Sequence, residues 1–377
     1  MFSISVVIKK SMLTAKVVAL ALGDQHSVVL KEDGSVWSTP ITLRVLVPSR
    51  GVSKSFVKEI AYDAMAVAAG NRYSMVLKQD GSVWGAGRNS RGQLGDGSRL
   101  SKTVFSFVQT IPGAETVSAG GYHTLVLTNN GRVWATGWNN YGQLGDGLAA
   151  ARSRFFLAIS GGVKAVGAGE IHSVVLLEDG SVSAAGRNHN GQLGDGSTDD
   201  KSSFGKVMSS DATDISAGGY HTLVLKQDGS VWATGWNKYG QLGDESVTDR
   251  NEYVQVVSGE GTAVTAGSRH SLVLKQDGSV WAAGYNLYGQ LGGDWTTNSK
   301  NFIKVMSEGA TAIAAGAYHS MLIKTDGSVW ATGSNRYGQF GDDSTSSKKF
   351  FVRLALTNDG VRRNAIMYTW THLDDPQ

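Results

Sequence analysis

The hydrophobic and polar positions of this chain follow one pattern that returns about every 49 residues. In its clearest copy, an apolar run over 311–315 precedes the tetrapeptide 316–319. Two alternating stretches, 319–324 and 328–332, then flank an Asp-Gly pair at 326–327. Alternation with a period of two predicts strands with one buried face. The pattern therefore predicts several short strands in each repeat and no long helix.

An Asp-Gly pair separates the two alternating stretches in nearly every repeat. Both central residues of a type I′ hairpin turn need positive φ, which Asp tolerates and Gly adopts freely. The pair occurs at Asp33-Gly34, Asp80-Gly81, Asp179-Gly180, Asp228-Gly229, Asp277-Gly278 and Asp326-Gly327, with Asn130-Gly131 replacing it once. Seven type I′ hairpins are therefore predicted.

Seven repeats result when the chain is aligned on the glycine of a Gly-x-x-His tetrapeptide. These glycines lie 47 to 50 residues apart, at Gly23, Gly70, Gly120, Gly169, Gly218, Gly267 and Gly316. A further β-prone run follows each Gly-x-Asn-x-x-Gly-Gln-Leu-Gly-Asp loop, so each repeat offers about four strands. Seven such units can close a ring, whereas an open solenoid would favour distinct capping repeats.

We therefore predict an all-β fold, a seven-bladed β-propeller of four-stranded antiparallel blades, forming a single domain over residues 1–377. The repeat pattern weakens at both ends of the chain. We expect the N-terminal segment around 6–10 to pair with strands of the tail after 343, so that the N- and C-terminal segments close the ring.

The composition supports a propeller and excludes some classes of partner. Forty-nine glycines, four prolines and only 18% charged residues suit tight turns between buried strands. The formal charge of +3 comes without a basic run, which argues against nucleic acid as a partner. No apolar run is long enough to span a membrane, and the apolar residues near the N-terminus lie in register with the first repeat. We expect a cytoplasmic protein without a cofactor.

Histidine and aspartate are the candidate catalytic or metal-binding residues, but both are repeat elements. The histidines share one repeat position, at His26, His123, His172, His221, His270 and His319, with Tyr73 in the second repeat. Equivalent residues on adjacent blades lie about 10 Å apart, too far to share one zinc ion. We predict that each imidazole bridges backbone groups within or between blades.

The repeated aspartates and tryptophans are also interpreted as structural. Aspartates near a glycine turn commonly accept backbone hydrogen bonds, which we expect of Asp96, Asp146, Asp195, Asp244 and Asp342. Calcium binding at 195–200 is an open alternative, although the segment lacks a full calcium-loop spacing. We expect each tryptophan of the Ser-Val-Trp motif or its equivalent to pack between blades. These are Trp37, Trp84, Trp134, Trp232, Trp281 and Trp330, with Ser183 at this position in the fourth repeat.

Three repeated motifs carry a resemblance to a known family: A-G-x-x-H-[ST], L-K-x-D-G-S-V-W-A-x-G and N-x-x-G-Q-L-G-D-G. Over residues 17–353 the chain resembles the regulator of chromosome condensation repeat, whose members form seven-bladed propellers. The resemblance leaves function open, because the family includes an exchange factor for a small nuclear GTPase, a plant ultraviolet photoreceptor, a β-lactamase inhibitor and scaffolding modules.

Residues that differ between repeats are the candidates for partner binding. The position before the His carries Gln25, Arg72, Tyr122, Ile171, Tyr220, Arg269 and Tyr318, and the loops add Trp138, Trp236 and Tyr285. The resemblance places the first seven around one mouth of the propeller. Because Tyr and Arg often dominate interface energy, we predict a non-enzymatic protein-interaction propeller with a Tyr/Arg-rich face.

The alternative function is guanine-nucleotide exchange on a small GTPase. In the family's exchange factor a wedge inserted in one blade does this work. Repeats two to six keep a length of 49 or 50 residues here, which leaves no room for such an insertion. The photoreceptor reading would need Trp in tetrapeptides that carry Gly121, Gly219, Ser268 and Ala317 instead.

Overall fold

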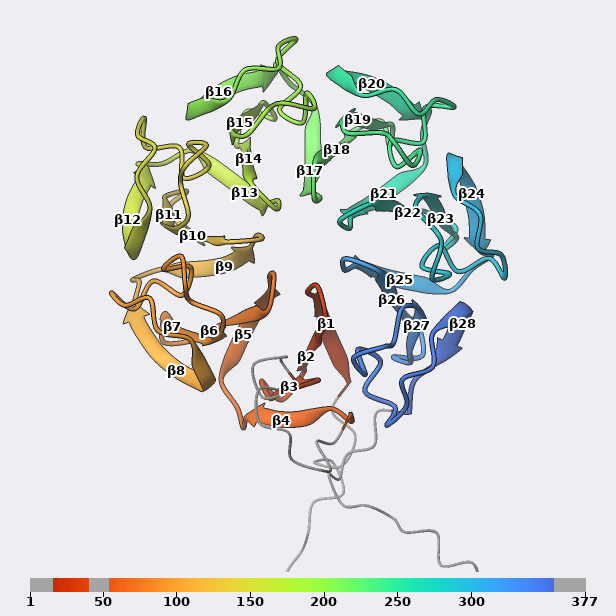
Figure 1. The fold of residues 1–377 in the computed structure, drawn as a ribbon, viewed down its shortest axis with the longest axis horizontal. Coiled ribbons are helices and arrows are strands. Elements are labelled where there is room, and N and C mark those ends of the chain that lie inside the picture. Colours follow the sequence, from red (N-terminus) through yellow and green to blue (C-terminus); the bar gives the residue numbers. More distant parts are fainter. Residues whose placement is uncertain (1–15, 41–53, 356–377) are drawn as a thin grey trace, which may run out of the picture.

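The described part of the chain forms a ring of β-sheets around a central axis (Figure 1). This computed structural model describes residues 16–40 and 54–355. Those residues form 28 strands in seven four-stranded sheets, and none of them forms a helix. Over the same residues there is accordingly no helix that could cross a membrane. The predicted all-β, seven-bladed propeller is confirmed.

Each blade is a meander of four antiparallel strands from one contiguous segment. Blade 1 contains β1 (Val17–Leu22), β2 (Ser27–Lys31), β3 (Val36–Ser38) and β4 (Val57–Ile60). Blade 2 contains β5 (Ala64–Ala69), β6 (Tyr73–Lys78), β7 (Ser82–Gly87) and β8 (Lys102–Thr110). Blade 3 contains β9 (Ala114–Ala119), β10 (His123–Thr128), β11 (Val133–Gly137) and β12 (Arg152–Ile159). Blade 4 contains β13 (Val163–Ala168), β14 (His172–Leu177), β15 (Val182–Gly186) and β16 (Lys201–Met208).

The remaining three blades repeat the same order. Blade 5 contains β17 (Ala212–Ala217), β18 (His221–Lys226), β19 (Val231–Gly235) and β20 (Arg250–Val257). Blade 6 contains β21 (Gly261–Ala266), β22 (His270–Lys275), β23 (Val280–Gly284) and β24 (Ser299–Met306). Blade 7 contains β25 (Ala310–Ala315), β26 (His319–Lys324), β27 (Val329–Gly333) and β28 (Lys348–Arg353). In every blade the first strand lies nearest the axis (Figure 1).

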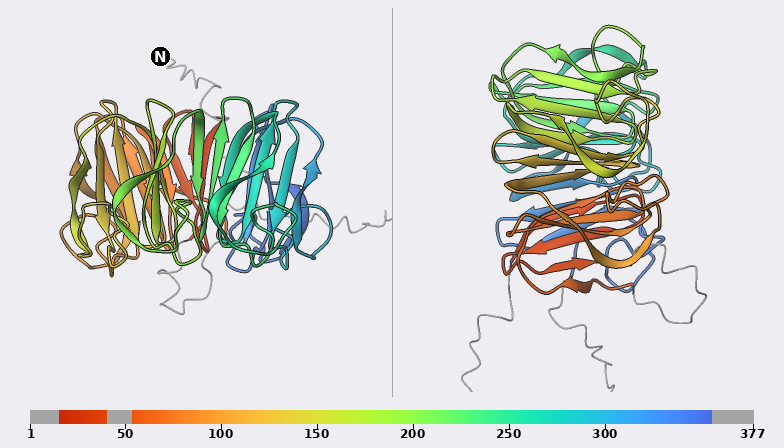
Figure 2. Two further views of the ribbon diagram at one scale, coloured as in Figure 1. Left: turned by 90° about the horizontal axis from the view of Figure 1, so that it is seen from above. Right: turned by 90° about the vertical axis from the view of Figure 1, so that its left-hand side faces the viewer.

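The meander sorts the connections onto two faces of the ring (Figure 2). Since consecutive strands run in opposite directions, the turns after the first and third strands of a blade lie on one face, which we call the loop face. The turn after the second strand lies on the opposite face, which we call the hairpin face. The Gly-x-x-His turns and the Gly-x-Asn loops therefore share the loop face.

The Asp-Gly hairpins are present, but their turn is not type I′. In blade 7, Gly327 has a φ of 77°, whereas Asp326 is not among the residues with positive φ. The Gly327 amide donates to the Lys324 carbonyl, and the Lys324 amide donates to the Ser328 carbonyl. This is a three-residue loop with glycine in the left-handed position. The Asp326 carboxylate instead accepts the Ser328 amide at 2.9 Å, so the aspartate acts through its side chain.

The predicted packing of tryptophans between blades is confirmed. Trp281 on β23 packs against the core of blade 5, including Leu223 and Leu225. Its indole nitrogen donates to the Ser279 hydroxyl at 3.0 Å. The equivalent tryptophans also pack against the core of the preceding blade: Trp37, Trp84, Trp134, Trp232 and Trp330. Blade-to-blade packing is therefore apolar and repeats around the ring.

The Gly-Gln-Leu-Gly-Asp loop clamps the outer strand of the next blade. In blade 5, Gly243 has a φ of 75°, and a Cβ there would lie 2.4 Å from the Phe302 ring of blade 6. Asp244 accepts hydrogen bonds from the Asn237 amide at 2.8 Å and from the Ser246 backbone at 3.1 Å. The other loop aspartates accept the same pair of hydrogen bonds: Asp96, Asp146, Asp195 and Asp342. Their predicted structural role is confirmed.

The Asp195 carboxylate is contacted by protein donors at the place where calcium binding was an open alternative. It accepts hydrogen bonds from Asn188 and from both the amide and the hydroxyl of Ser197. Its second oxygen lies 3.3 Å from the Lys201 ammonium group. Protein donors thus already surround this carboxylate.

The histidines join neighbouring blades, but through a hydroxyl side chain and not through the backbone groups that we predicted. The His221 Nε2 lies 2.9 Å from the Ser271 hydroxyl of the next blade, and this hydroxyl donates to the Gln241 carbonyl at 2.6 Å. Because the hydroxyl hydrogen is used in that bond, His221 must donate from Nε2. The remaining pairs are His26–Ser74, His123–Ser173, His172–Thr222, His270–Ser320 and His319–Ser27.

Blades 1 and 7 meet through the same contacts as the other neighbours. His319 reaches Ser27 at 3.0 Å across 292 residues of sequence. Phe56, directly before the outer strand of blade 1, packs against Gly341 of blade 7. The tail residues Lys348–Arg353 form β28, which pairs with β27 of their own blade. The predicted pairing of 6–10 with the tail falls on residues outside the described ones.

Candidate functional site

The seven residues before the histidines stand around the loop face, but not all of them reach the surface. Arg72 is exposed, and the side chains Tyr122, Tyr220, Arg269 and Tyr318 are half-buried. Gln25 and Ile171 are only 8% and 3% exposed. These two side chains therefore offer little contact surface. For Ile171 the reason is its apolar side chain, which is withdrawn from water.

The aromatic residues of the loop face touch one another in series. In blade 3, Tyr122 meets Trp138 edge to face with ring centroids 5.5 Å apart, and Trp138 meets Tyr141 at 5.4 Å. The same order returns in blade 5, where Trp236 contacts Tyr220 at 5.7 Å and Tyr239 at 5.3 Å. Edge-to-face contacts of this kind stabilise a ring orientation beyond simple burial.

The series continues into blades 6 and 7. Tyr239 lies 4.8 Å from Tyr285, which in turn contacts Tyr288 and Tyr318. Tyr288 and Tyr318 also meet, at 5.5 Å. We call these nine residues the aromatic arc: Tyr122, Trp138, Tyr141, Tyr220, Trp236, Tyr239, Tyr285, Tyr288 and Tyr318.

Arginines complete the aromatic arc. Blade 4 has no Tyr or Trp in this series; its His189 ring lies 6.3 Å from Tyr141. Arg187 links blades 3 and 5, with its guanidinium 5.4 Å from the Tyr141 ring and 5.9 Å from the Tyr220 ring. Arg269 lies 5.5 to 5.8 Å from four rings of the arc. Cation–π contacts of this length hold the guanidinium group and the rings in one arrangement.

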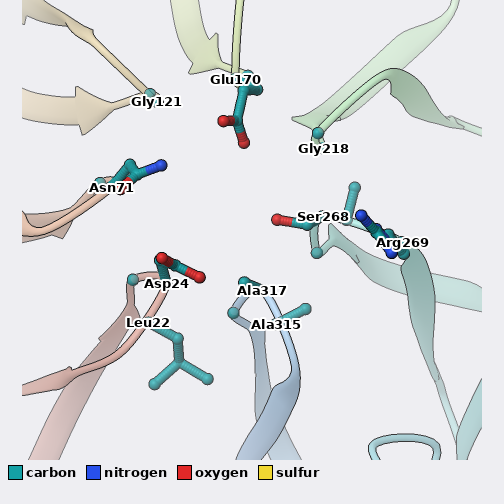
Figure 3. A pocket seen from close by; sticks show the side chains of 18 of the residues that line it. Leu22, Asp24, Asn71, Gly121, Glu170, Gly218, Ser268, Arg269, Ala315 and Ala317 are labelled. Carbon is teal, nitrogen blue, oxygen red and sulfur yellow. The ribbon is translucent and has the colours of Figure 1, made fainter. Parts of the chain in front are cut away.

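A cavity of about 270 Å³ opens at the centre of the loop face, where the Gly-x-x-His turns of all seven blades converge (Figure 3). Asp24, Asn71, Glu170, Ser268 and Arg269 are polar residues of its wall. The first four stand directly after the anchor glycine. Four polar residues of this wall were therefore missed, because only the second variable position of the tetrapeptide was interpreted as functional.

The two carboxyl groups of the cavity, Asp24 and Glu170, have pKa values above their ordinary values. Burial raises the pKa of Asp24, partly offset by the Arg72 guanidinium. Burial also raises the pKa of Glu170, and the negative charge of Asp24 raises it further, although the Asn71 side chain donates a hydrogen bond to it. The sequence did contain a sign of these carboxyl groups. The position directly after the anchor glycine carries an acid at Asp24 and Glu170 but a small residue at Gly121, Gly219 and Ala317.

Two family models match the sequence of this chain. The model of the RCC1-like domain matches residues 4–258, and the model of the regulator of chromosome condensation (RCC1) repeat matches 262–290 and 310–339. The chain belongs to the RCC1-like domain family. No curated protein matches its sequence.

Solved structures agree with the RCC1-like fold. Human WBSCR16 superposes with a TM-score of 0.73 and 24% identity, covering 82% of this chain and 86% of that one. Yeast RCC1 (Prp20), in its complex with Kap60, gives a TM-score of 0.70 and 20% identity, covering 78% of this chain and 75% of that one. A second structure, of Prp20p from Saccharomyces cerevisiae, gives the same TM-score and identity, with 78% and 77% covered. At these identities the likeness concerns the fold.

The RCC1-like loop face thus contains two distinct features. The aromatic arc includes six of the ten predicted binding residues, namely Tyr122, Tyr220, Tyr318, Trp138, Trp236 and Tyr285, with Arg269 stacked on it. Arg72 stands apart from the arc. The central cavity is the feature that our interpretation of the sequence overlooked.

Proposed function

We propose that this RCC1-like propeller is a non-enzymatic interaction module that contacts a protein partner with its aromatic arc. The observation that carries the proposal is the continuous series of half-buried rings and guanidinium groups over blades 3 to 7. Tyr, Trp and Arg are the residues most enriched among interface hot spots. Side chains already held by their neighbours lose little conformational entropy on binding.

Nucleotide exchange on a small GTPase is the second candidate function. Prp20p, a propeller of the same fold, has binding properties to Gsp1p and histones. In this chain, repeats two to six are 49 or 50 residues long, and this regularity favours a binding module over an exchange factor with an inserted wedge.

The test compares two variants that carry changes on opposite faces. The loop-face variant combines Tyr122→Ala, Tyr220→Ala, Tyr318→Ala and Arg269→Ala. The control variant combines Tyr62→Ala and Met65→Ala, whose side chains are 63% and 40% exposed on the hairpin-face side of blades 1 and 2. Equal far-UV circular dichroism and melting curves establish that both variants are folded.

We expect cross-linking and pull-down with the wild type and the control variant to recover the same partner. Loss of several hot-spot side chains, each contributing about 2 kcal/mol or more, should reduce recovery by the loop-face variant at least tenfold. Equal recovery by both variants would reject the arc as the contact surface. Release of bound nucleotide from a recovered GTPase, at rates well above its spontaneous release, would establish the exchange function instead.

A further inference from the structure

The central cavity has opposite charges on its two sides (Figure 3). Asp24 of blade 1 and Glu170 of blade 4 supply carboxylates. Across the opening, blade 6 supplies the Ser268 hydroxyl and the Arg269 guanidinium. The wall therefore offers acceptors for a cationic group and donors for an anionic group within one space.

The carboxylates and the guanidinium group of the cavity do not neutralise one another by direct contact. Over residues 16–40 and 54–355, no ion pair within 4 Å includes Asp24, Glu170 or Arg269. Arg269 is instead held by the rings of the aromatic arc, such as Tyr318 at 5.7 Å. Burial raises the pKa of both carboxyls, and the Arg72 charge at Asp24 and the Asn71 hydrogen bond and Arg269 charge at Glu170 offset this only in part.

Beneath this polar wall the cavity is lined by small apolar groups. The last residues of the innermost strands line it there, among them Leu22, Ala69, Ala217, Ala266 and Ala315. Its volume of about 270 Å³ lies below the roughly 300–1,000 Å³ of pockets for drug-sized ligands. The space suits one small molecule with a polar head and a short aliphatic part.

We propose that the cavity binds a free aliphatic α-amino acid as a zwitterion. Its ammonium group lies between Asp24 and Glu170, its carboxylate is bound by Arg269 and Ser268, and its side chain rests on the alanines of the lining. This function goes beyond protein binding by the aromatic arc, since it concerns a small ligand in the channel.

Simpler ligands fit the wall less well. A carboxylate without an ammonium group would bring a third negative charge beside Asp24 and Glu170. An amine without a carboxylate would leave the donors of Ser268 and Arg269 unused. The described residues contain no group of three His, Asp or Glu side chains that could hold a metal ion.

Isothermal titration calorimetry of the full chain with L-valine tests the proposal. Two analogues separate the charged groups: isobutylamine lacks the carboxylate, and isovalerate lacks the ammonium group. Because charge-assisted hydrogen bonds contribute about tenfold or more to binding, we expect valine to bind at least tenfold more tightly than either analogue. Absence of valine binding, or equal affinity for isobutylamine, would overturn the proposal without any variant.

Variants then locate the ligand within the cavity. We expect Asp24→Asn combined with Glu170→Gln, and separately Arg269→Gln, to weaken valine binding at least tenfold. The matched control is Arg336→Gln, which removes an arginine that is stacked on Tyr288 and does not line the cavity; its affinity should stay within twofold of wild type. Unchanged affinity in the folded cavity variants would reject this location.

Discussion

Acid should unfold this propeller sharply, because six histidines are buried at the blade interfaces. Burial lowers the pKa of His26, His172 and His270 to about 4, from 6.5. Burial lowers the pKa of His123, His221 and His319 to about 3, and neighbouring imidazoles contribute to the lowering. In all six rings, for example His221, the Nδ1 atom that a second proton would occupy has no hydrogen-bond partner within the described structure.

The sign of the effect follows from linkage. Below pH 6.5 the unfolded chain binds protons at these histidines while the folded chain does not, so the free energy of unfolding falls as the pH falls. The loss continues until the pH reaches the folded values of about 4 and 3. At about pH 5.5 each histidine accounts for between about 1 and 2 kcal/mol. Six of them sum to roughly 8 kcal/mol, comparable to the whole stability of many domains.

The assay is thermal unfolding followed by circular dichroism at a series of pH values between 7.5 and 4.5. We expect the melting temperature to fall steeply below about pH 6.5. The chain offers a matched variant, because Tyr73 already replaces one histidine and its hydroxyl contacts Thr124 at 3.1 Å. His172→Tyr places a tyrosine opposite Thr222 in the same way.

His172→Tyr should reduce the loss of stability between pH 7 and 5.5 by between about 1 and 2 kcal/mol. His189→Gln is the control, because its imidazole is 55% exposed and is not buried in a blade interface; the pH dependence of stability should change little. A melting temperature that stays constant from pH 7 to 5, or an unchanged slope in His172→Tyr, would refute this account of the histidines.

Two further substitutions test the packing between blades. Trp281→Ala should lower the free energy of unfolding by roughly 2 to 3 kcal/mol. This is less than the roughly 3 to 5 kcal/mol of a fully buried tryptophan, because the ring is half-buried over the blade 5 core. A melting curve like that of the wild type would contradict this packing. Gly243→Ala should lower the free energy of unfolding by about 2 kcal/mol or more, since the residue has a φ of 75° and its Cβ would meet Phe302 at 2.4 Å. Gly205→Ala is the control, because nothing lies within 4 Å of its Cβ. Equal melting temperatures for the two variants would show that the loop clamp is dispensable.

The features that the sequence predicted correctly are local or periodic. The hairpins follow from a glycine such as Gly327 that must adopt positive φ, and the blade number follows from the repeat of the Gly-x-x-His tetrapeptide. The turn type was wrong because Asp326 stabilises the hairpin through its side chain and stays out of the left-handed region. Both turn types use the same two residues, so composition does not separate them.

The features that sequence reasoning missed depend on the ring. His221 and its partner Ser271 are 50 residues apart, and only the closed arrangement of blades brings them into contact. The inward placement of Asp24 and Glu170 has the same origin, since single turns from blades 1 and 4 meet at the axis. The burial of Gln25 and Ile171 likewise depends on neighbouring blades and has no local signature.

The seam between blades 1 and 7 has a consequence for the synthesis of the protein. The hydrogen bond between Ser27 and His319 spans 292 residues, so one flank of blade 1 has no neighbour until the last blade has left the ribosome. At translation rates of about 5–20 residues per second, that wait lasts roughly 15 to 60 seconds. Throughout this time apolar residues such as Val29 and Trp37, which join the seam core in the finished ring, face solvent. We therefore expect nascent chains of this propeller to need protection of this apolar flank until the ring closes.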